Sequence, residues 1–192
     1  MITAVLFDFA GVVVNEGFWD WIYRNVPHVE QVKKEIAQLS EKVDRGELPA
    51  HAYETFLAAK TGKSSEVVKN EILHEYVVNQ DMLSLLKQLR GKIKIALMTN
   101  FPVDWFYPLI EKHDLHQYFD VIFISSELGL IKPEEAFYRK AVDTLHVRKD
   151  QAVFIDDRKE NALAAERLGL HGIVFTSVDL LRKDLEKLGL SV

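Results

Sequence analysis

The sequence predicts an α/β fold: a parallel sheet with helices on both faces, and a small helical cap inserted after the first strand. Short apolar runs rich in β-branched residues alternate with helical patterns in the second half of the chain, which is typical of a parallel sheet. One such run also opens the chain, and residues 15–80 then show helical patterns alone. Polar residues directly follow most of the strand-like runs, so chemistry is expected at one edge of the sheet.

Composition limits the class of protein. The chain has 192 residues, 48% of them hydrophobic, which suits one domain with an insertion. A net charge of -5 gives no support to nucleic acid or an anionic membrane as partner. There is no cysteine, no basic leader and no stretch of ~20 apolar residues. We therefore expect a soluble cytoplasmic protein.

The first strand is predicted at residues 2–7, a β-branched and aromatic run typical of a buried strand. Asp8 follows it directly, and Gly11 then allows a sharp turn or a close backbone approach. In open α/β sheets, ligands bind beyond the carboxyl ends of the strands. Asp8 is therefore a candidate functional residue, although an ordinary turn aspartate fits this segment alone equally well.

Residues 15–80 are predicted to form the cap domain, and residues 1–14 and 81–192 the α/β core. Pro27, Gly46, Pro49 and Gly62 separate the helical patterns, and Ser64 resembles the N-cap of the fourth helix. Each pattern places a stripe of apolar residues on one face of a helix, and such stripes usually pack in a hydrophobic core. The four stripes are Phe18, Trp19, Ile22 and Tyr23; Val32, Ile36, Leu39 and Val43; Tyr53, Phe56 and Leu57; and Val67, Val68, Ile72 and Tyr76.

The rest of the core alternates between strands and helices. A helix at 81–90 precedes strands at 93–98, 121–124, 152–155 and 172–175. Helical patterns follow these strands at about 103–113, 134–145, 159–168 and 178–188. Because the carboxyl ends of parallel strands share one edge, the polar residues that follow them should meet. With Asp8, these residues are Thr99, Asn100, Lys132, Asp156 and Asp157.

Phosphoryl transfer is the chemistry that requires this set of residues. Adjacent carboxylates suit a hard cation such as Mg²⁺, which offsets the repulsion between an anionic nucleophile and a phosphate. The Asp8 carboxylate can attack phosphorus and form an acyl phosphate. Thr99 and Asn100 can hydrogen-bond phosphoryl oxygens, and Lys132 can pair with both Asp8 and the phosphate.

Segments 6–12, 97–100, 132–133 and 154–157 resemble the four ordered motifs of the haloacid dehalogenase (HAD) superfamily, and the insert resembles its helical C1 cap. The pair Asp156-Asp157 with Asn161 is similar to a variant in soluble epoxide hydrolase N-terminal phosphatase domains and related glucose-1-phosphate-type phosphatases. The resemblance implies a Rossmann-like core. It also implies an Mg²⁺-dependent phosphatase of small phosphorylated metabolites that works through an aspartyl phosphate.

The resemblance also implies residue roles. Asp8 would be the nucleophile, and Thr99, Asn100 and Lys132 would hold the phosphoryl group. Mg²⁺ would be bound by Asp8, by the backbone carbonyl of Ala10 and by Asp157, with Asp156 close by or bonded through water. The charged turn 44–47 is read either as a solvated loop or as a substrate loop in which Arg45 contacts the variable part of the substrate.

Position 10 departs from the pattern of the superfamily. Most of its phosphatases have an aspartate there that protonates the leaving oxygen and later activates water, and such help is worth about 10²–10⁴-fold in rate. Ala10 has no proton to give. Substrates with good leaving groups would avoid the need for one. Alternatively, another residue such as His28 or His51 of the cap supplies the proton, or the protein is an impaired phosphate-ligand or protein-binding module.

The superfamily also includes two other chemistries. Phosphonoacetaldehyde hydrolases also have alanine at this position and need a cap lysine that forms a Schiff base with the substrate. The cap offers Lys33, Lys34, Lys42, Lys60, Lys63 and Lys69, which mostly fall on solvated faces. Haloacid dehalogenases have an aromatic residue in place of Ala10, so dehalogenation has no support.

Overall fold

The computed structural model describes residues 1–191, and its centre is one parallel sheet. The strands are β1 (Ala4–Phe7), β2 (Lys94–Thr99), β3 (Val121–Ile124), β4 (Ala152–Asp156) and β5 (His171–Val174). They are ordered β3-β2-β1-β4-β5, and every neighbouring pair is parallel. The α/β class and the parallel sheet predicted from the alternating pattern are confirmed.

The register of the sheet brings the ends of three strands together. Phe7 of β1 is level with Leu97 of β2 and Ile155 of β4. Asp8 follows Phe7, and Thr99 and Asp156 end the two neighbouring strands. These three side chains therefore emerge at the same edge of the sheet.

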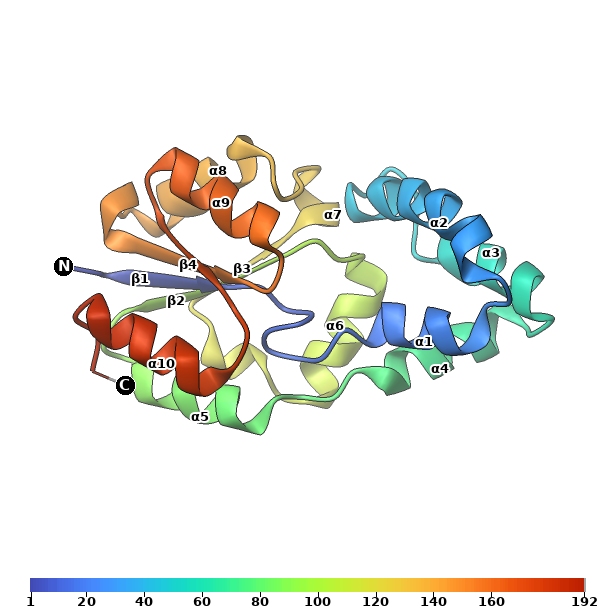
Figure 1. Cartoon of the computed structure of the whole chain (residues 1–192), viewed down its shortest axis with the longest axis horizontal. Helices are drawn as coiled ribbons and strands as arrows, with labels where there is room; N and C mark the ends of the chain where they lie inside the picture. Colours follow the sequence, from blue (N-terminus) through green and yellow to red (C-terminus); the bar gives the residue numbers. More distant parts are fainter. Residues whose placement is uncertain (192) are drawn as a thin grey trace.

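Helices cover both faces of the sheet (Figure 1). One face carries α8 (Glu135–Leu145) and α9 (Lys159–Leu168), and the other carries α5 (Gln80–Leu89), α6 (Val103–Lys112) and α10 (Val178–Lys187). Because side chains alternate along a strand, Leu6 packs in the α8–α9 core while Val5 and Phe7 pack in the opposite one. The short helix α7 (Ser125–Leu128) and the 3₁₀ turns His116–Tyr118 and Lys149–Gln151 complete the core.

Four helices lie together beyond one end of the sheet (Figure 1). They are α1 (Gly17–Asn25), α2 (Val29–Asp44), α3 (His51–Thr61) and α4 (Ser65–Glu75). Ser64 caps α4 as expected, since its Oγ accepts a hydrogen bond from the Val67 amide at 3.3 Å. Tyr23 and Val67, which were expected on buried stripes, are 51% and 43% exposed, so those two positions were wrong.

The chain passes between the sheet and these helices twice, and the two crossings run side by side. Val14 and Val78 form an antiparallel bridge. The Asn15 amide donates to the Val77 carbonyl at 3.1 Å, and the Asn79 amide donates to the Val13 carbonyl at 3.0 Å. The domain boundaries proposed after residues 14 and 80 stay a prediction. Within residues 1–191, no helix combines the length and apolarity needed to cross a bilayer.

One hydrophobic core continues from the sheet into the cap helices, where it includes Ile36, Leu57 and Ile72. Leu57 of α3 is fully buried. We expect Leu57→Ala to lower the free energy of unfolding by about 2–5 kcal/mol through lost burial and the cavity left behind. Urea unfolding followed by circular dichroism measures this loss, and the shared core predicts a single transition.

The matched control is Val67→Ala on α4, where the side chain is largely exposed and the change should stay within about 0.5 kcal/mol. Two separate transitions in the wild-type protein would contradict a core that is shared between the cap helices and the sheet.

Candidate active site

A buried lysine joins two carboxylates at the sheet edge. The Nζ atom of Lys132 lies 2.7 Å from Oδ1 of Asp8 and 2.8 Å from Oδ2 of Asp156. All three side chains are buried. Burial of an unpaired ammonium would be costly, and the two carboxylates offset that cost. The expected pairing of Lys132 with Asp8 is present in this arrangement.

Both carboxylate oxygens of Asp156 accept hydrogen bonds from protein groups. Its Oδ1 accepts from the Arg158 amide at 2.9 Å and from Asn161 Nδ2 at 3.0 Å, and its Oδ2 accepts from Asn161 and from Lys132. The Tyr138 hydroxyl holds the Asn161 carbonyl at 3.0 Å. Asp156 therefore positions Lys132, which fits its expected place close to a metal rather than directly on it.

Asp157 is suited to be a metal ligand. Its Oδ1 is buried and has no hydrogen-bond partner among residues 1–191. One carboxylate oxygen each from Asp8, Asp156 and Asp157 lie within 4.8 Å of one another. Gly11 makes room for this carboxylate, because a Cβ there would lie 2.5 Å from Asp157 Oδ2. An unpartnered buried oxygen within a carboxylate cluster fits a hard divalent cation.

Asn100 lines the same cavity as Asp8 and Thr99, and its side chain also contacts the backbone of Lys132. Its Nδ2 donates to the Lys132 carbonyl at 3.0 Å, and its Oδ1 accepts from the Lys132 amide at 2.8 Å. The side chain therefore fixes the backbone that presents Lys132. The expected hydrogen bond from Asn100 to a phosphoryl oxygen stays a prediction. Thr99 lies beside it at the end of β2 and lines the same cavity as Asp8 and Ala10.

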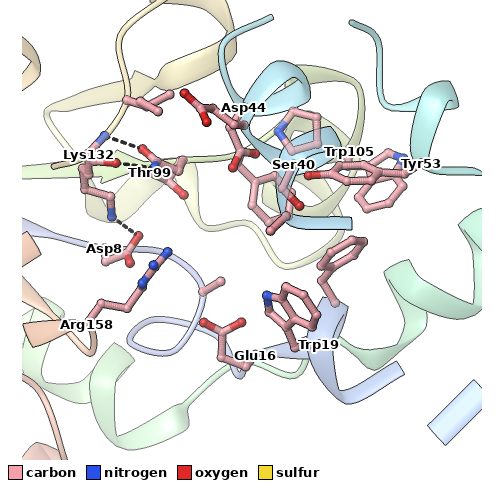
Figure 2. Close-up of a pocket in the computed structure, with 18 of the residues that line it drawn as sticks. Asp8, Glu16, Trp19, Ser40, Asp44, Tyr53, Thr99, Trp105, Lys132 and Arg158 are labelled. Carbon is pink, nitrogen blue, oxygen red and sulfur yellow. Dashed lines mark hydrogen bonds and ion pairs between the residues drawn. The ribbon is translucent and has the colours of Figure 1, made fainter. Parts of the chain in front are cut away.

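The cavity measures about 600 Å³ and lies between the sheet edge and the cap. Asp8, Thr99 and Lys132 lie at one end, and Tyr53 and Trp105 lie at the other (Figure 2). The rings of Tyr53 and Trp105 are 5.5 Å apart. The pocket thus joins a charged end, suited to a phosphoryl group, with a wall suited to the apolar part of a ligand.

Two further carboxylates, Asp44 from α2 and Glu16 from the segment before α1, lie on opposite sides of this cavity (Figure 2). Burial raises the pKa of Asp44 to about 7, against the opposing effect of Lys132 and Arg158. Burial, together with the charge of Asp157, raises the pKa of Glu16 to about 7. Neither residue was singled out from the sequence, because helical periodicity does not show which polar residue of a cap turn faces inward.

Burial dominates the electrostatics at the sheet edge as well. It raises the pKa of Asp8 well above its usual value, aided by Asp156 and opposed by Lys132. Burial and Asp156 also raise the pKa of Asp157. Burial alone would lower the pKa of Lys132, but the charges of Asp156 and Asp8 outweigh it and raise that pKa. A bound cation would lower the pKa values of Asp8 and Asp157 again, because its positive charge stabilises the ionised carboxylates.

Arg45 does not line the cavity. Its Nη2 pairs with Glu134 Oε1 at 2.5 Å and its Nη1 with Oε2 at 3.2 Å, so the expected contact with substrate is replaced by an ion pair between the cap and the core. His51 does not line the cavity either: its side chain is 68% exposed, and its Nδ1 lies 2.9 Å from Glu54 Oε2. His28 is exposed at the start of α2. The neighbour of Arg45, Asp44, faces the site instead.

The raised pKa of Asp44 predicts a pH-dependent stability. The ordinary pKa of the carboxyl, 3.8, applies to the unfolded chain, whereas the folded value is about 7. As pH rises between these values, the unfolded state ionises while the folded state keeps its proton, so the folded state loses stability. The free energy of unfolding of Asp44→Asn, relative to that of wild type, should therefore be higher at pH 8 than at pH 5. Urea unfolding with EDTA measures both differences, and an equal difference at the two pH values would contradict the assignment.

Comparison with known proteins places this site in a family. A model of haloacid dehalogenase-like hydrolases matches residues 2–169. A sesquiterpene phosphatase from Aspergillus oryzae is 35% identical over 96 residues, which are 50% of this chain and 49% of that protein. Flavin mononucleotide hydrolase 1 from Arabidopsis thaliana is 36% identical over 112 residues, covering 58% of this chain and 45% of that protein. The chain thus spans about half the length of these two relatives.

Solved structures show the same fold. A HAD family enzyme from Bacteroides thetaiotaomicron, a mutant in complex with magnesium and inorganic phosphate, superposes with a TM-score of 0.76 at 19% identity. The match covers 92% of this chain and 95% of that one. The fold is therefore the Rossmann-like α/β fold of HAD proteins, and the chain belongs to the haloacid dehalogenase-like hydrolase family.

Proposed function

We propose that this protein is an Mg²⁺-dependent phosphatase of small phosphorylated metabolites and that Asp8 is its nucleophile. The observation that supports this most directly is the orientation of the Asp8 carboxylate. Its Oδ1 accepts from Lys132 Nζ at 2.7 Å and from the Phe9 amide at 2.6 Å, while its Oδ2 has no hydrogen-bond partner among the described residues. One oxygen is thus held, and the other is available to attack phosphorus.

The surrounding groups suit a phosphoryl group in front of Asp8. The positive charge of Lys132 can stabilise the negative charge that develops on the phosphoryl oxygens. The Thr99 hydroxyl can donate a hydrogen bond to one of these oxygens. Asn100 holds the backbone of Lys132 through two hydrogen bonds, and Asp156 holds its ammonium group through an ion pair. Catalysis of phosphoryl transfer depends mainly on such positioning and charge stabilisation.

Asp8, Asp157 and the backbone carbonyl of Ala10 would hold the metal. Bound Mg²⁺ supplies positive charge that lowers the repulsion between the Asp8 carboxylate and the phosphate. The unpartnered Oδ1 of Asp157 and the raised pKa values of Asp8 and Asp157 support this assignment. The complex of the structural neighbour with magnesium and inorganic phosphate is consistent with it.

The alternatives have less support. A phosphonoacetaldehyde hydrolase needs a cap lysine in the pocket, but of the lysines in the described chain only Lys132, which belongs to the core, lines the cavity. The cap residue Lys63, for example, is paired with Glu71 and Asn25. A non-catalytic binding module would not require the held carboxylate of Asp8, and it is tested with the same variant as the phosphatase.

We expect Asp8→Asn to reduce hydrolysis of 4-nitrophenyl phosphate in the presence of Mg²⁺ by about 10³-fold or more, because the nucleophile is lost. Phosphate release and acid-quench labelling of the protein measure the effect. The control is Asp143→Asn on the exposed side of α8, which should hydrolyse the substrate at the wild-type rate. Equal rates for wild type and Asp8→Asn would exclude Asp8 as nucleophile.

Metal dependence gives a separate prediction. Removal of divalent cations with EDTA should abolish hydrolysis, and Mg²⁺ should raise the melting temperature of the wild-type protein because it binds only the folded state. Asp157→Asn should weaken Mg²⁺ binding about 10-fold or more, as judged by calorimetry. Asp179→Asn on α10 is the matched control. Unchanged Mg²⁺ affinity in Asp157→Asn would contradict the assigned ligand set.

A further inference from the structure

We propose that Asp44 of the cap performs the acid–base role that Ala10 cannot, giving a proton to the leaving group and then taking one from water. This inference rests on the proposed phosphatase function. It concerns a residue on a different element, 34 positions along the chain from Ala10. The acid would thus come from the cap rather than from the loop that holds the nucleophile.

The position of Asp44 supports this role. It is the last residue of α2 and lines the same cavity as Asp8, Ala10 and Lys132. Figure 2 shows it projecting from the cap side of the pocket, across from Glu16 and between the Lys132 end and the aromatic wall. The Asp44 side chain makes no hydrogen bond or ion pair with any of residues 1–191, so its carboxyl group is free to exchange a proton with a ligand.

The two residues after Asp44 hold it over the site. Arg45 pairs with Glu134, which lies two positions beyond Lys132. Gly46 lies against the backbone of Ser126 in α7, where an added Cβ would be 2.1 Å from the Ser126 carbonyl oxygen. Both contacts join the cap turn to the core. Asp44 is therefore placed by docking of the turn and would leave the site when the cap opens.

The surroundings of Asp44 favour proton exchange near neutrality. Burial raises its pKa to about 7, while Lys132 and Arg158 of the core oppose the shift. Tyr53 and Tyr76 lie close enough for the charge of Asp44 to raise their own pKa values, and Glu16 faces it across the cavity. A general acid and base is most effective when its pKa lies close to the working pH, because both forms are then populated.

The proposed reaction has two steps, and Asp44 transfers one proton in each. Asp8 attacks phosphorus, the bond from phosphorus to the leaving oxygen breaks, and that oxygen takes the proton of the Asp44 carboxyl. Water then attacks phosphorus of the acyl phosphate and gives a proton to the Asp44 carboxylate. The bond from phosphorus to the Asp8 oxygen breaks, which releases inorganic phosphate carrying the remaining O–H of the water. Asp8 is then again a carboxylate and Asp44 again a protonated carboxyl.

Glu16 is the competing carboxylate, and its position differs. Asp157 contributes to the raised pKa of Glu16, so this residue lies in the field of the acidic cluster that would hold the cation. Lys132 and Arg158 act on the pKa of both carboxyl groups, but Asp157 acts on that of Glu16 and not on that of Asp44. Asp44 lies across the cavity from Glu16, on the cap side of the ligand space (Figure 2). Glu16→Gln is therefore the discriminating variant rather than a neutral control.

The test compares kcat/KM for two substrates of similar size, 4-nitrophenyl phosphate with a good leaving group and benzyl phosphate with a poor one. Asp44→Asn should lower the value for benzyl phosphate by about 10²–10⁴-fold and that for 4-nitrophenyl phosphate by less than about 10-fold. It should also accumulate phosphorylated Asp8 with 4-nitrophenyl phosphate, seen as a burst of nitrophenolate. Glu35→Gln on the exposed side of α2 is the control and should match wild type.

Rescue separates a proton-transfer role from a structural one. Adding Ala10→Asp to Asp44→Asn should restore hydrolysis of benzyl phosphate, since it supplies a carboxyl group from the other side. Equal losses on both substrates, or a selective loss in Glu16→Gln and not in Asp44→Asn, would overturn the assignment of Asp44. A wild-type protein that hydrolyses neither substrate and never labels Asp8 would overturn the proposed function itself.

Discussion

The ammonium group of Lys132, held between Asp8 and Asp156, is the interaction on which the rest of the site depends. Two buried carboxylates this close would otherwise repel each other, and one of them would take up a proton. The lysine keeps charge at the sheet edge, and a dense set of contacts keeps the lysine in place. Asn100 holds its backbone, Asn161 holds its partner Asp156, and the ring of Phe154 lies 5.6 Å below its Nζ.

This arrangement explains why the fold is built as it is around β1. The central strand is entirely buried and delivers Asp8 between the ends of β2 and β4. Each neighbouring strand then supplies a residue with one function: Thr99 faces the ligand space, and Asp156 anchors the lysine. The cap closes the space above them with side chains such as Asp44 and Tyr53. The core therefore provides the charge and the Trp105 side of the aromatic wall, while the cap provides Tyr53 and a second set of acidic groups.

Sequence reasoning could predict the sheet and the residues at its edge, because both follow from periodicity and from parallel strands ending together. It placed Asp8, Thr99, Lys132, Asp156 and Asp157 at one edge, and they do lie there. It could not predict which side of the turn 44–47 faces inward. The difference between Arg45 and Asp44 depends on how the turn docks on Ser126 and Glu134, which are distant in sequence. The same limit applies to Asn100, whose partner is the backbone of a remote loop.

The paired crossings between sheet and cap have a mechanical consequence. Because residues 13–15 and 77–79 are hydrogen-bonded to each other, they form a two-stranded ribbon that resists shear and bends most easily across its strands. In Figure 1 the ribbon lies in the lower half of the view, where the chain enters α1 and leaves α4, while α2 lies in the upper half, near α7. A rotation of the cap about this ribbon would therefore displace the end of α2 near α7 more than the start of α1. Asp44 ends α2, so such a rotation would change its distance from the sheet edge more than that of a residue near the ribbon.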